Sequence, residues 1–108
     1  MHRDIKPENI YYLSETNRAK IGDFTLAKNC NDDGEAMVFD QAGSVPFMPP
    51  EAFAGEPYRG KPMDIWAFGV SVFCYVALYN PFLERDENQT KENIKSMDIQ
   101  YPTEFSPQ

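Results

Sequence analysis

Residues 2–9 read HRDIKPEN, a polar stretch that brings Asp4, Lys6 and Asn9 close together in the chain. We call this stretch the HRD loop. An aspartate on a tight loop can accept the proton of a hydroxyl group, and an amide oxygen can ligate a hard cation such as Mg²⁺. Taken singly, each residue is explained equally well as part of a solvated turn. The combination makes the loop a candidate site.

A second carboxylate follows at a spacing that returns it to the HRD loop. Residues 10–13 (IYYL) and 19–22 (AKIG) are short β-prone segments, and the polar residues between them predict a hairpin with a turn of four or five residues. Asp23 comes directly after this hairpin, in the sequence Gly22-Asp23-Phe24. Asn9 and Asp23 are therefore a plausible pair of Mg²⁺ ligands beside the phosphates of a nucleotide.

Four motifs along the chain together resemble the catalytic segment of the eukaryotic protein kinases: HRDIKPENI, GDF, GSVPFMPPE and DIWAFGV. Their order and spacing match throughout, and the resemblance covers essentially the whole chain. It implies an α+β fold, namely a fragment of a kinase C-lobe that is mainly α with a small β-hairpin. Residues 1–108 are accordingly expected to be a partial kinase domain, with the N-lobe and the terminal C-lobe helices absent.

The resemblance also implies a role for each matching residue. Asp4 corresponds to the catalytic base, Lys6 to the contact with the transferred phosphate, and Asn9 and Asp23 to the Mg²⁺ ligands. The HRDxKPEN pattern is similar to that of serine/threonine kinases, in which the residue matching Ser44 bridges the catalytic aspartate and lysine. The implied cofactors are ATP and Mg²⁺, and the implied partner is a protein substrate, which includes the case of another kinase.

Several further matches imply structural roles. Asp64 resembles the aspartate that hydrogen-bonds the backbone of the catalytic loop, and Trp66 and Gly69 resemble packing residues. Glu51 matches a glutamate whose usual arginine partner does not follow in this chain. His2 has no companion ligands, so we expect a buried imidazole with satisfied hydrogen bonds.

The chain also departs from the family pattern. Thr25 replaces a glycine, and a β-branched residue is expected to restrict the conformations of Asp23 and Phe24. Pro49 stands where the family pattern has an alanine, and Phe47 stands where it often has a tyrosine. Both replacements are tolerable. Between Leu26 and Gly43 there is no Ser, Thr or Tyr to phosphorylate. We hypothesise that carboxylates of this loop supply a constitutive negative charge that pairs with Arg3. The alternative is that the acidic residues only belong to a solvated loop. The acids concerned are Asp32, Asp33, Glu35 and Asp40.

The remaining pattern predicts two longer helices. The first spans Asp64–Tyr79 with Asp64 as its cap, and its apolar residues cover every face, which predicts a helix central to the core. The second, Arg85–Met97, is expected to be exposed and weakly amphipathic. A short helix is expected at Glu51–Phe53 after Pro50, and an irregular loop from Leu26 to Ala42.

Composition excludes several classes of function. The 108 residues carry a formal charge of −7, and residues 29–56 contain six acidic and no basic side chains, so a nucleic-acid partner is not expected. Cys30 and Cys74 fit neither a zinc site nor a disulfide framework. The polar N-terminus is unlike a signal peptide, and the uncharged run 65–83 favours a buried helix over a membrane anchor. We expect an intracellular location, cytoplasmic or nuclear.

The alternatives to an active kinase follow from motifs that the chain lacks. It contains no GxGxxG, and we expect the isolated chain to be poorly folded and inactive. A non-catalytic binding module therefore stays open beside the kinase reading, as does a small acidic or membrane-anchored domain. Within the family, residues 45–48, the insert 53–61 and the end of the long helix are similar to calcium/calmodulin-dependent protein kinase kinases and to the fungal kinases upstream of the AMP-activated kinases.

Overall fold

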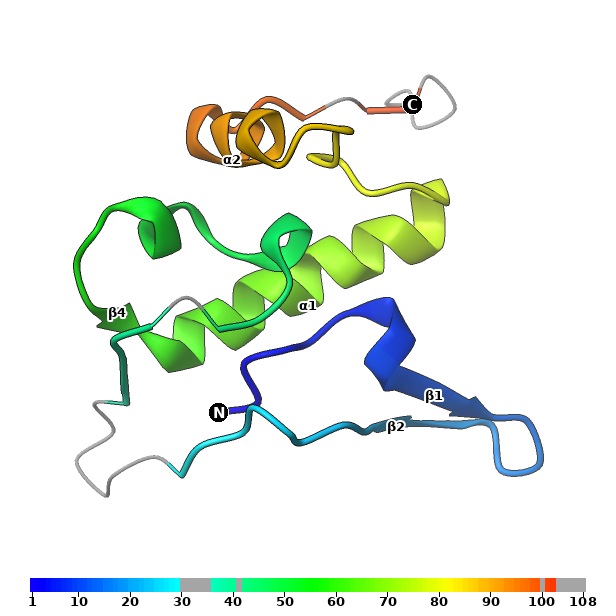
Figure 1. Cartoon of the computed structure of the whole chain (residues 1–108). Coiled ribbons are helices and arrows are strands. Elements are labelled where there is room, and N and C mark those ends of the chain that lie inside the picture. Colours follow the sequence, from blue (N-terminus) through cyan, green and yellow to red (C-terminus); the bar gives the residue numbers. More distant parts are fainter. Residues whose placement is uncertain (30–35, 41, 100, 103–108) are drawn as a thin grey trace.

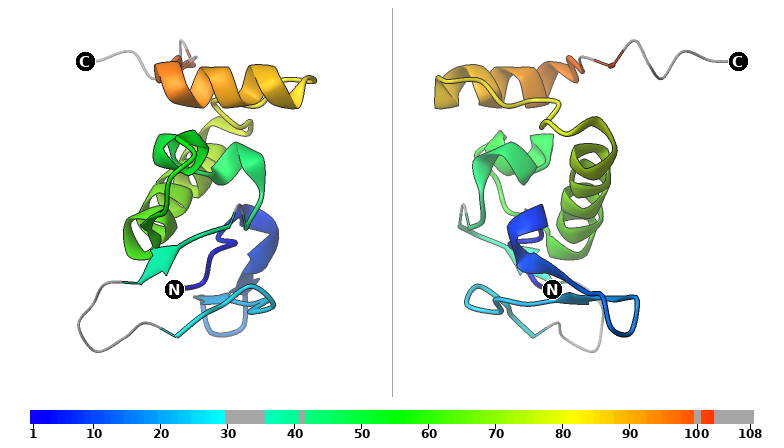
Figure 2. Two further views of the ribbon diagram at one scale, coloured as in Figure 1. Left: turned by 60° about the vertical axis from the view of Figure 1, so that its left-hand side comes forward. Right: turned by 90° about the vertical axis from the view of Figure 1, so that its right-hand side faces the viewer.

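The computed structural model describes residues 1–29, 36–40, 42–99 and 101–102. Its elements are the 3-10 helices η1 (Pro7–Asn9), η2 (Val45–Phe47) and η3 (Pro50–Phe53), the strands β1 (Ile10–Leu13), β2 (Arg18–Ile21), β3 (Met37–Val38) and β4 (Tyr58–Arg59), and the helices α1 (Gly60–Ala77) and α2 (Glu87–Ser96). Helix α1 crosses the middle of the molecule, with α2 on one side and the β1–β2 hairpin on the other (Figures 1 and 2). The expected α+β composition is confirmed for these residues.

The predicted hairpin is present. Strand β1 pairs antiparallel with β2, with Ile10 opposite Ile21 and Leu13 opposite Arg18. The connection closes at Asn17, which adopts a left-handed φ of 52° and accepts a hydrogen bond of 2.8 Å from the Tyr12 hydroxyl. Both strands are largely exposed, so the hairpin is held by its turn and by its attachment to the HRD loop.

Helix α1 starts four residues earlier than its sequence pattern predicts. It begins at Gly60, and Pro62 lies in its first turn, where a proline leaves no intrahelical donor missing. Asp64 is therefore not the cap, and that prediction was wrong. The helix ends at Ala77, because Leu78 turns into the left-handed conformation with φ 66° and donates its N–H to the Cys74 carbonyl oxygen.

The burial of α1 also differs from the prediction. One face is buried, through Met63, Ala67, Val70 and Ser71, and it contributes Met63 to one apolar cluster and Val70 to another. The first cluster includes Val38, Met48, Ala52 and Tyr58, and the second includes Phe82 and Ile94. The opposite face is exposed among the described residues, with Phe68 at 53% and Ile65 at 72% of full exposure. Helix α1 is thus a core helix on one side only.

The shorter elements fit the predicted positions with two refinements. Helix α2 lies inside the predicted 85–97 range, and its N-terminus is capped by Asp86, whose carboxylate accepts the Asn88 N–H at 3.0 Å. The expected short helix is a 3-10 turn. The sequence missed β3 because two residues are too few for a periodic signal, although Met37 and Val38 pair antiparallel with Arg59 and Tyr58. The rest of the predicted loop lies partly outside the described residues.

One side chain ties the N-terminus to the central helix. The Asp64 carboxylate accepts the backbone N–H of His2 at 2.7 Å and that of Arg3 at 2.9 Å. This confirms the predicted contact between Asp64 and the HRD loop backbone. Within the described part of the chain, no helix is long and apolar enough to cross a membrane.

We expect Asp64→Ala to destabilise the fold by about 2–4 kcal/mol, because two buried backbone donors lose a charged acceptor. The measurement is the free energy of unfolding of the longest natural polypeptide that contains this sequence, which we call the longest natural product of the gene. Asp98→Ala is the matched control, since Asp98 is exposed beyond α2. Equal stability of the two variants would contradict the role given to Asp64.

Candidate active site

Three polar side chains converge at the HRD loop. The Ser44 hydroxyl donates to Asp4 Oδ1 at 3.0 Å and accepts from Lys6 Nζ at 2.8 Å. Lys6 Nζ also lies 3.8 Å from Asp4 Oδ2. The predicted bridge by Ser44 is therefore present, and it holds a carboxylate and an ammonium group side by side at a partly exposed position. Such a pair can accept a proton and steady a developing negative charge in one place.

The same loop orients the Asn9 side chain. Its side-chain nitrogen donates to the Asp4 carbonyl oxygen at 2.9 Å and lies 3.4 Å from Asp4 Oδ2. The residue is 5% exposed, so these bonds fix the amide. The amide nitrogen is thus the atom that the loop engages through Asp4.

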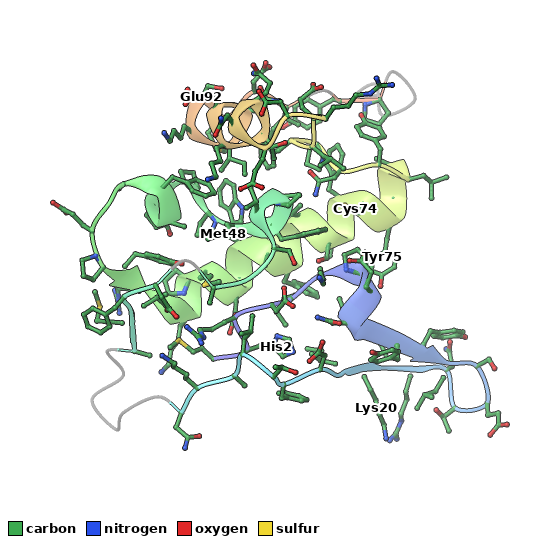
Figure 3. The ribbon with its side chains drawn as sticks, viewed as in Figure 1. His2, Lys20, Met48, Cys74, Tyr75 and Glu92 are labelled. Carbon is green, nitrogen blue, oxygen red and sulfur yellow. The ribbon has the colours of Figure 1, made fainter. Side chains whose placement is uncertain are left out.

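The segment after β2 returns to the HRD loop through Gly22. Its N–H donates to the Asn9 carbonyl oxygen at 2.9 Å, and its carbonyl oxygen is 2.8 Å from His2 Nε2. His2 lies between the N-terminal segment and the segment after β2, and its Nδ1 accepts the Asp4 N–H (Figure 3). The prediction of a buried, satisfied imidazole is confirmed, and Asp23 is placed one residue from the Asn9 contact.

Asp23 is held by the residue that departs from the family pattern. Its Oδ1 accepts hydrogen bonds from both the hydroxyl and the backbone N–H of Thr25. These bonds hold the pKa of the Asp23 carboxyl below its ordinary value. The left-handed φ falls on Asp23 itself, at 54°, and not on Thr25. The prediction that Thr25 restricts the conformations of Asp23 and Phe24 stays a prediction.

The predicted metal ligands are too few to hold a metal ion without further ligands. Among the described residues, no group of three or more His, Cys, Asp or Glu side chains could hold a metal by itself. Mg²⁺ is commonly bound by one or two protein oxygens together with substrate phosphates. The sequence predicts the Asn9 amide oxygen and the Asp23 carboxylate as such an incomplete set, and the lowered pKa of Asp23 suits it to this role.

Arg3 connects the HRD loop to two other segments. Its guanidinium is 5% exposed, donates from Nε to the Leu26 carbonyl oxygen at 2.6 Å, and pairs through Nη1 with Asp40 Oδ1 at 2.9 Å. The backbone of Arg3 is left-handed, with φ 72°, which is costly for a residue with a side chain. The predicted acids Asp32, Asp33 and Glu35 lie outside the described residues.

A pocket of about 580 Å³ opens beside Lys6 and Ser44. Its apolar lining includes Phe47, Leu78 and Leu83, and Glu8 adds a carboxylate. Cys74 also lines this pocket, and burial raises the pKa of its thiol, so the sulfur stays protonated and weakly nucleophilic. The pocket therefore combines an apolar wall with one basic group, Lys6, and one acidic group, Glu8.

Other predicted positions have mixed outcomes. Trp66 packs as expected, stacking on Phe82 with ring centroids 5.9 Å apart. Gly69 does not, because it is exposed and an added Cβ would meet no atom within 4 Å. Gly43 was not among the predicted positions, yet its φ of 107° lets it approach the Arg3 carbonyl oxygen. It also missed the Thr25 hydroxyl bond, although a Thr two residues after an Asp is a known local pattern.

Comparison with known proteins gives one consistent result. The protein kinase domain family matches residues 1–107. The chain is 36% identical over 105 residues to calcium/calmodulin-dependent protein kinase type II subunit delta of Oryctolagus cuniculus and 38% identical over 105 residues to the type II alpha chain of Drosophila melanogaster. It is 34% identical over 102 residues to serine/threonine-protein kinase 40 of Homo sapiens.

These alignments cover nearly all of the chain but little of each relative. The two type II kinases are matched over 95% of this chain and 19% of their own length, and serine/threonine-protein kinase 40 over 94% and 23%. The chain therefore spans about a fifth of the length of the relatives it matches.

We expect Thr25→Val to raise the pKa of Asp23 toward its ordinary value. Hydrogen bonds to a carboxylate favour its ionised form, so removing the hydroxyl donor shifts the equilibrium toward the protonated form. A carbon-13 NMR titration of the Asp23 carboxyl measures this in the longest natural product. Thr16→Val, in the exposed hairpin turn, is the control. An Asp23 titration that is identical in both variants would exclude a role for the hydroxyl.

Proposed function

The chain belongs to the protein kinase domain family, and from that premise we propose that it supplies the catalytic loop and metal-binding segment of a serine/threonine protein kinase that uses ATP and Mg²⁺. The observation that carries the proposal is the bridge from Ser44 to both Asp4 and Lys6, at 3.0 and 2.8 Å. It joins Asp4 and Ser44, which are 40 positions apart in the chain. It also places a proton acceptor beside a cation, as phosphotransfer to a hydroxyl requires.

The proposed reaction uses Asp4 as its base. The substrate hydroxyl gives its proton to the Asp4 carboxylate, its oxygen forms a bond to the γ-phosphorus of ATP, and the bond from that phosphorus to the ADP oxygen breaks. Asp4 Oδ1 accepts the Ser44 hydroxyl, whereas Oδ2 accepts only the long 3.4 Å bond from Asn9 and is the oxygen that receives the proton. Lys6 Nζ, 3.8 Å from Oδ2, contacts the phosphoryl group as negative charge shifts across it.

Asn9 and Asp23 would hold the magnesium ion through their side-chain oxygens. When bound, Mg²⁺ supplies positive charge to the phosphates and neutralises charge on the leaving group. The protein fixes one ligand by the two Asn9 bonds to Asp4 and the other by the Thr25 bonds to Asp23. Both ligands are thus oriented by hydrogen bonds within the chain.

A protein substrate, including another kinase, fits the pocket beside Ser44. The adjoining surface is apolar with a carboxylate at Glu8, which suits a peptide more than a small polar acceptor. The serine/threonine preference rests on the matched relatives, which are serine/threonine kinases, and on the HRDxKPEN pattern. The narrower similarity to calcium/calmodulin-dependent protein kinase kinases, the intracellular location and the inactivity of the chain tested alone stay predictions.

A non-catalytic binding module is the second candidate. It is favoured by the exposed apolar side chains of α1, among them Phe68 at 53%, Val76 at 59% and Tyr75 at 51% of full exposure. Apolar side chains that share a face and meet solvent commonly mark a surface for another protein segment. This reading needs no proton acceptor at Asp4, which makes the two candidates separable.

We expect Asp4→Asn to lower kcat by about 10²–10⁴-fold, because the amide cannot accept the hydroxyl proton. Its oxygen can still accept the Ser44 hydroxyl, so the melting temperature should stay close to that of the wild type. The assay is phosphate transfer from Mg·ATP to a serine peptide and a matching tyrosine peptide, by the longest natural product.

Asp98→Asn is the control and should leave kcat unchanged. Transfer by Asp4→Asn at the wild-type rate would contradict the proposed base. If the wild-type protein binds partners but transfers no phosphate to either peptide, the binding module is the better account.

A further inference from the structure

The Asn80 side chain joins two turns that are distant in the chain, the η2 turn and the turn of residues 80–84. Its Oδ1 accepts the backbone N–H of Phe82 at 2.9 Å and that of Leu83 at 3.2 Å. Its Nδ2 donates to the Pro46 carbonyl oxygen at 3.2 Å. An amide oxygen only accepts and an amide nitrogen only donates, so these three bonds together require one orientation of the side-chain amide.

The Pro46 carbonyl oxygen needs a donor from outside its own turn. At η2, the carbonyl oxygens of Ser44 and Val45 each accept the N–H group three residues later. The same pattern would give Pro46 the N–H of position 49, but Pro49 is a proline and has none. Backbone carbonyl oxygens that are shielded from water are almost always paired. Asn80 supplies the donor that the η2 turn itself lacks.

Helix α2 anchors the 80–84 turn. Asn93 donates from Nδ2 to the Phe82 carbonyl oxygen at 3.1 Å. The Thr90 hydroxyl accepts the Glu84 N–H at 2.9 Å, and Thr90 is only 1% exposed. The turn is therefore fixed to a regular helix, and its asparagine carries that constraint across to the η2 turn.

The two joined turns line the pocket of about 580 Å³ that opens beside Lys6 and Ser44. Pro46 contributes from the η2 turn, and Asn80 and Leu83 contribute from the 80–84 turn. Leu83 is 57% exposed although its backbone N–H is bonded, so its side chain is available to a ligand in the pocket. The separation of the two turns therefore sets the shape of the pocket, and the Asn80 bonds fix this separation.

We propose that Asn80 is a positioning residue for the protein substrate, which holds the η2 turn against the 80–84 turn and so fixes the surface on which a substrate peptide lies. The inference rests on the proposed kinase function and deepens it, because it concerns the binding of the peptide and not the transfer step. The three Asn80 bonds involve neither the predicted base nor the predicted metal ligands. A change at Asn80 therefore weakens peptide binding and leaves the reacting groups in place.

Two substitutions separate the two halves of this link. Asn80→Asp keeps the shape of the side chain and an acceptor for the Phe82 and Leu83 N–H groups, but it replaces the donor to Pro46 with a second acceptor. Asn80→Ala removes all three bonds. Asn88→Asp is the matched control, since it makes the same chemical change at an exposed position of α2.

The test uses the longest natural product and the serine peptide that it binds most tightly from a degenerate library. Fluorescence anisotropy of the labelled peptide gives the Kd for each variant. We expect Asn80→Asp to raise this Kd by about 3- to 10-fold, Asn80→Ala to raise it at least as much, and Asn88→Asp to leave it unchanged. In the transfer assay the KM for the peptide should rise by a similar factor, while kcat and the KM for ATP stay within about twofold.

Hydrogen exchange followed by mass spectrometry tests the link itself. Asn80→Asp should speed exchange in residues 45–48 and leave residues 82–83 close to the wild type, because the acceptor for those two N–H groups is kept. Asn80→Ala should speed exchange in both segments. A side chain with a merely structural role in its own turn would affect residues 82–83 alone.

Three results would overturn the inference: a wild-type protein that binds no serine peptide of the library, wild-type peptide affinity in Asn80→Ala, or wild-type exchange at residues 45–48 in both Asn80 variants. Peptide binding and hydrogen exchange do not depend on phosphate transfer. Peptide binding that weakens as expected, in a protein that transfers no phosphate, would therefore count against the proposed function alone. Full transfer activity with an unchanged peptide KM in Asn80→Ala would count against the role of Asn80 alone.

Discussion

The contact between the Asp64 carboxylate and two successive backbone N–H groups, those of His2 and Arg3, underlies the whole arrangement. An acceptor on a regular helix fixes the start of a loop that has few regular hydrogen bonds of its own. From that point the His2 ring reaches Gly22 and the Arg3 side chain reaches Leu26 and Asp40. One residue of α1 thus orients both the loop and the segments that meet it.

The sequence predicted the parts of the site that depend on residue type and local spacing. The hairpin, the bridge by Ser44, the contact of Asp64 and the buried state of His2 were all expected, because each follows from a short motif or from a match to the kinase pattern. The roles of Asp4, Lys6, Asn9 and Asp23 in chemistry stay predictions. Asp40 was one of four candidate acids, and only the three-dimensional contact with Arg3 distinguishes it.

What the sequence could not predict depends on tertiary contacts. Helix α1 extends back to Gly60 because Pro62 is harmless in a first turn, although a proline usually ends a helical pattern. The strand at Met37–Val38 forms only because Tyr58–Arg59 lies opposite. An apolar pattern on all faces of α1 predicted full burial, yet periodicity reports which residues suit a core and not which neighbours are present to cover them.

At Arg3 an unfavourable, left-handed backbone conformation and favourable side-chain contacts occur in the same residue. A φ of 72° stores strain of about 1–3 kcal/mol in a residue with a side chain, and a glycine there would release it. Glycine would also remove the cation that joins three segments. The arginine therefore stands where tertiary contacts to Leu26 and Asp40 offset a local backbone cost, and neither term can be changed at this position without the other.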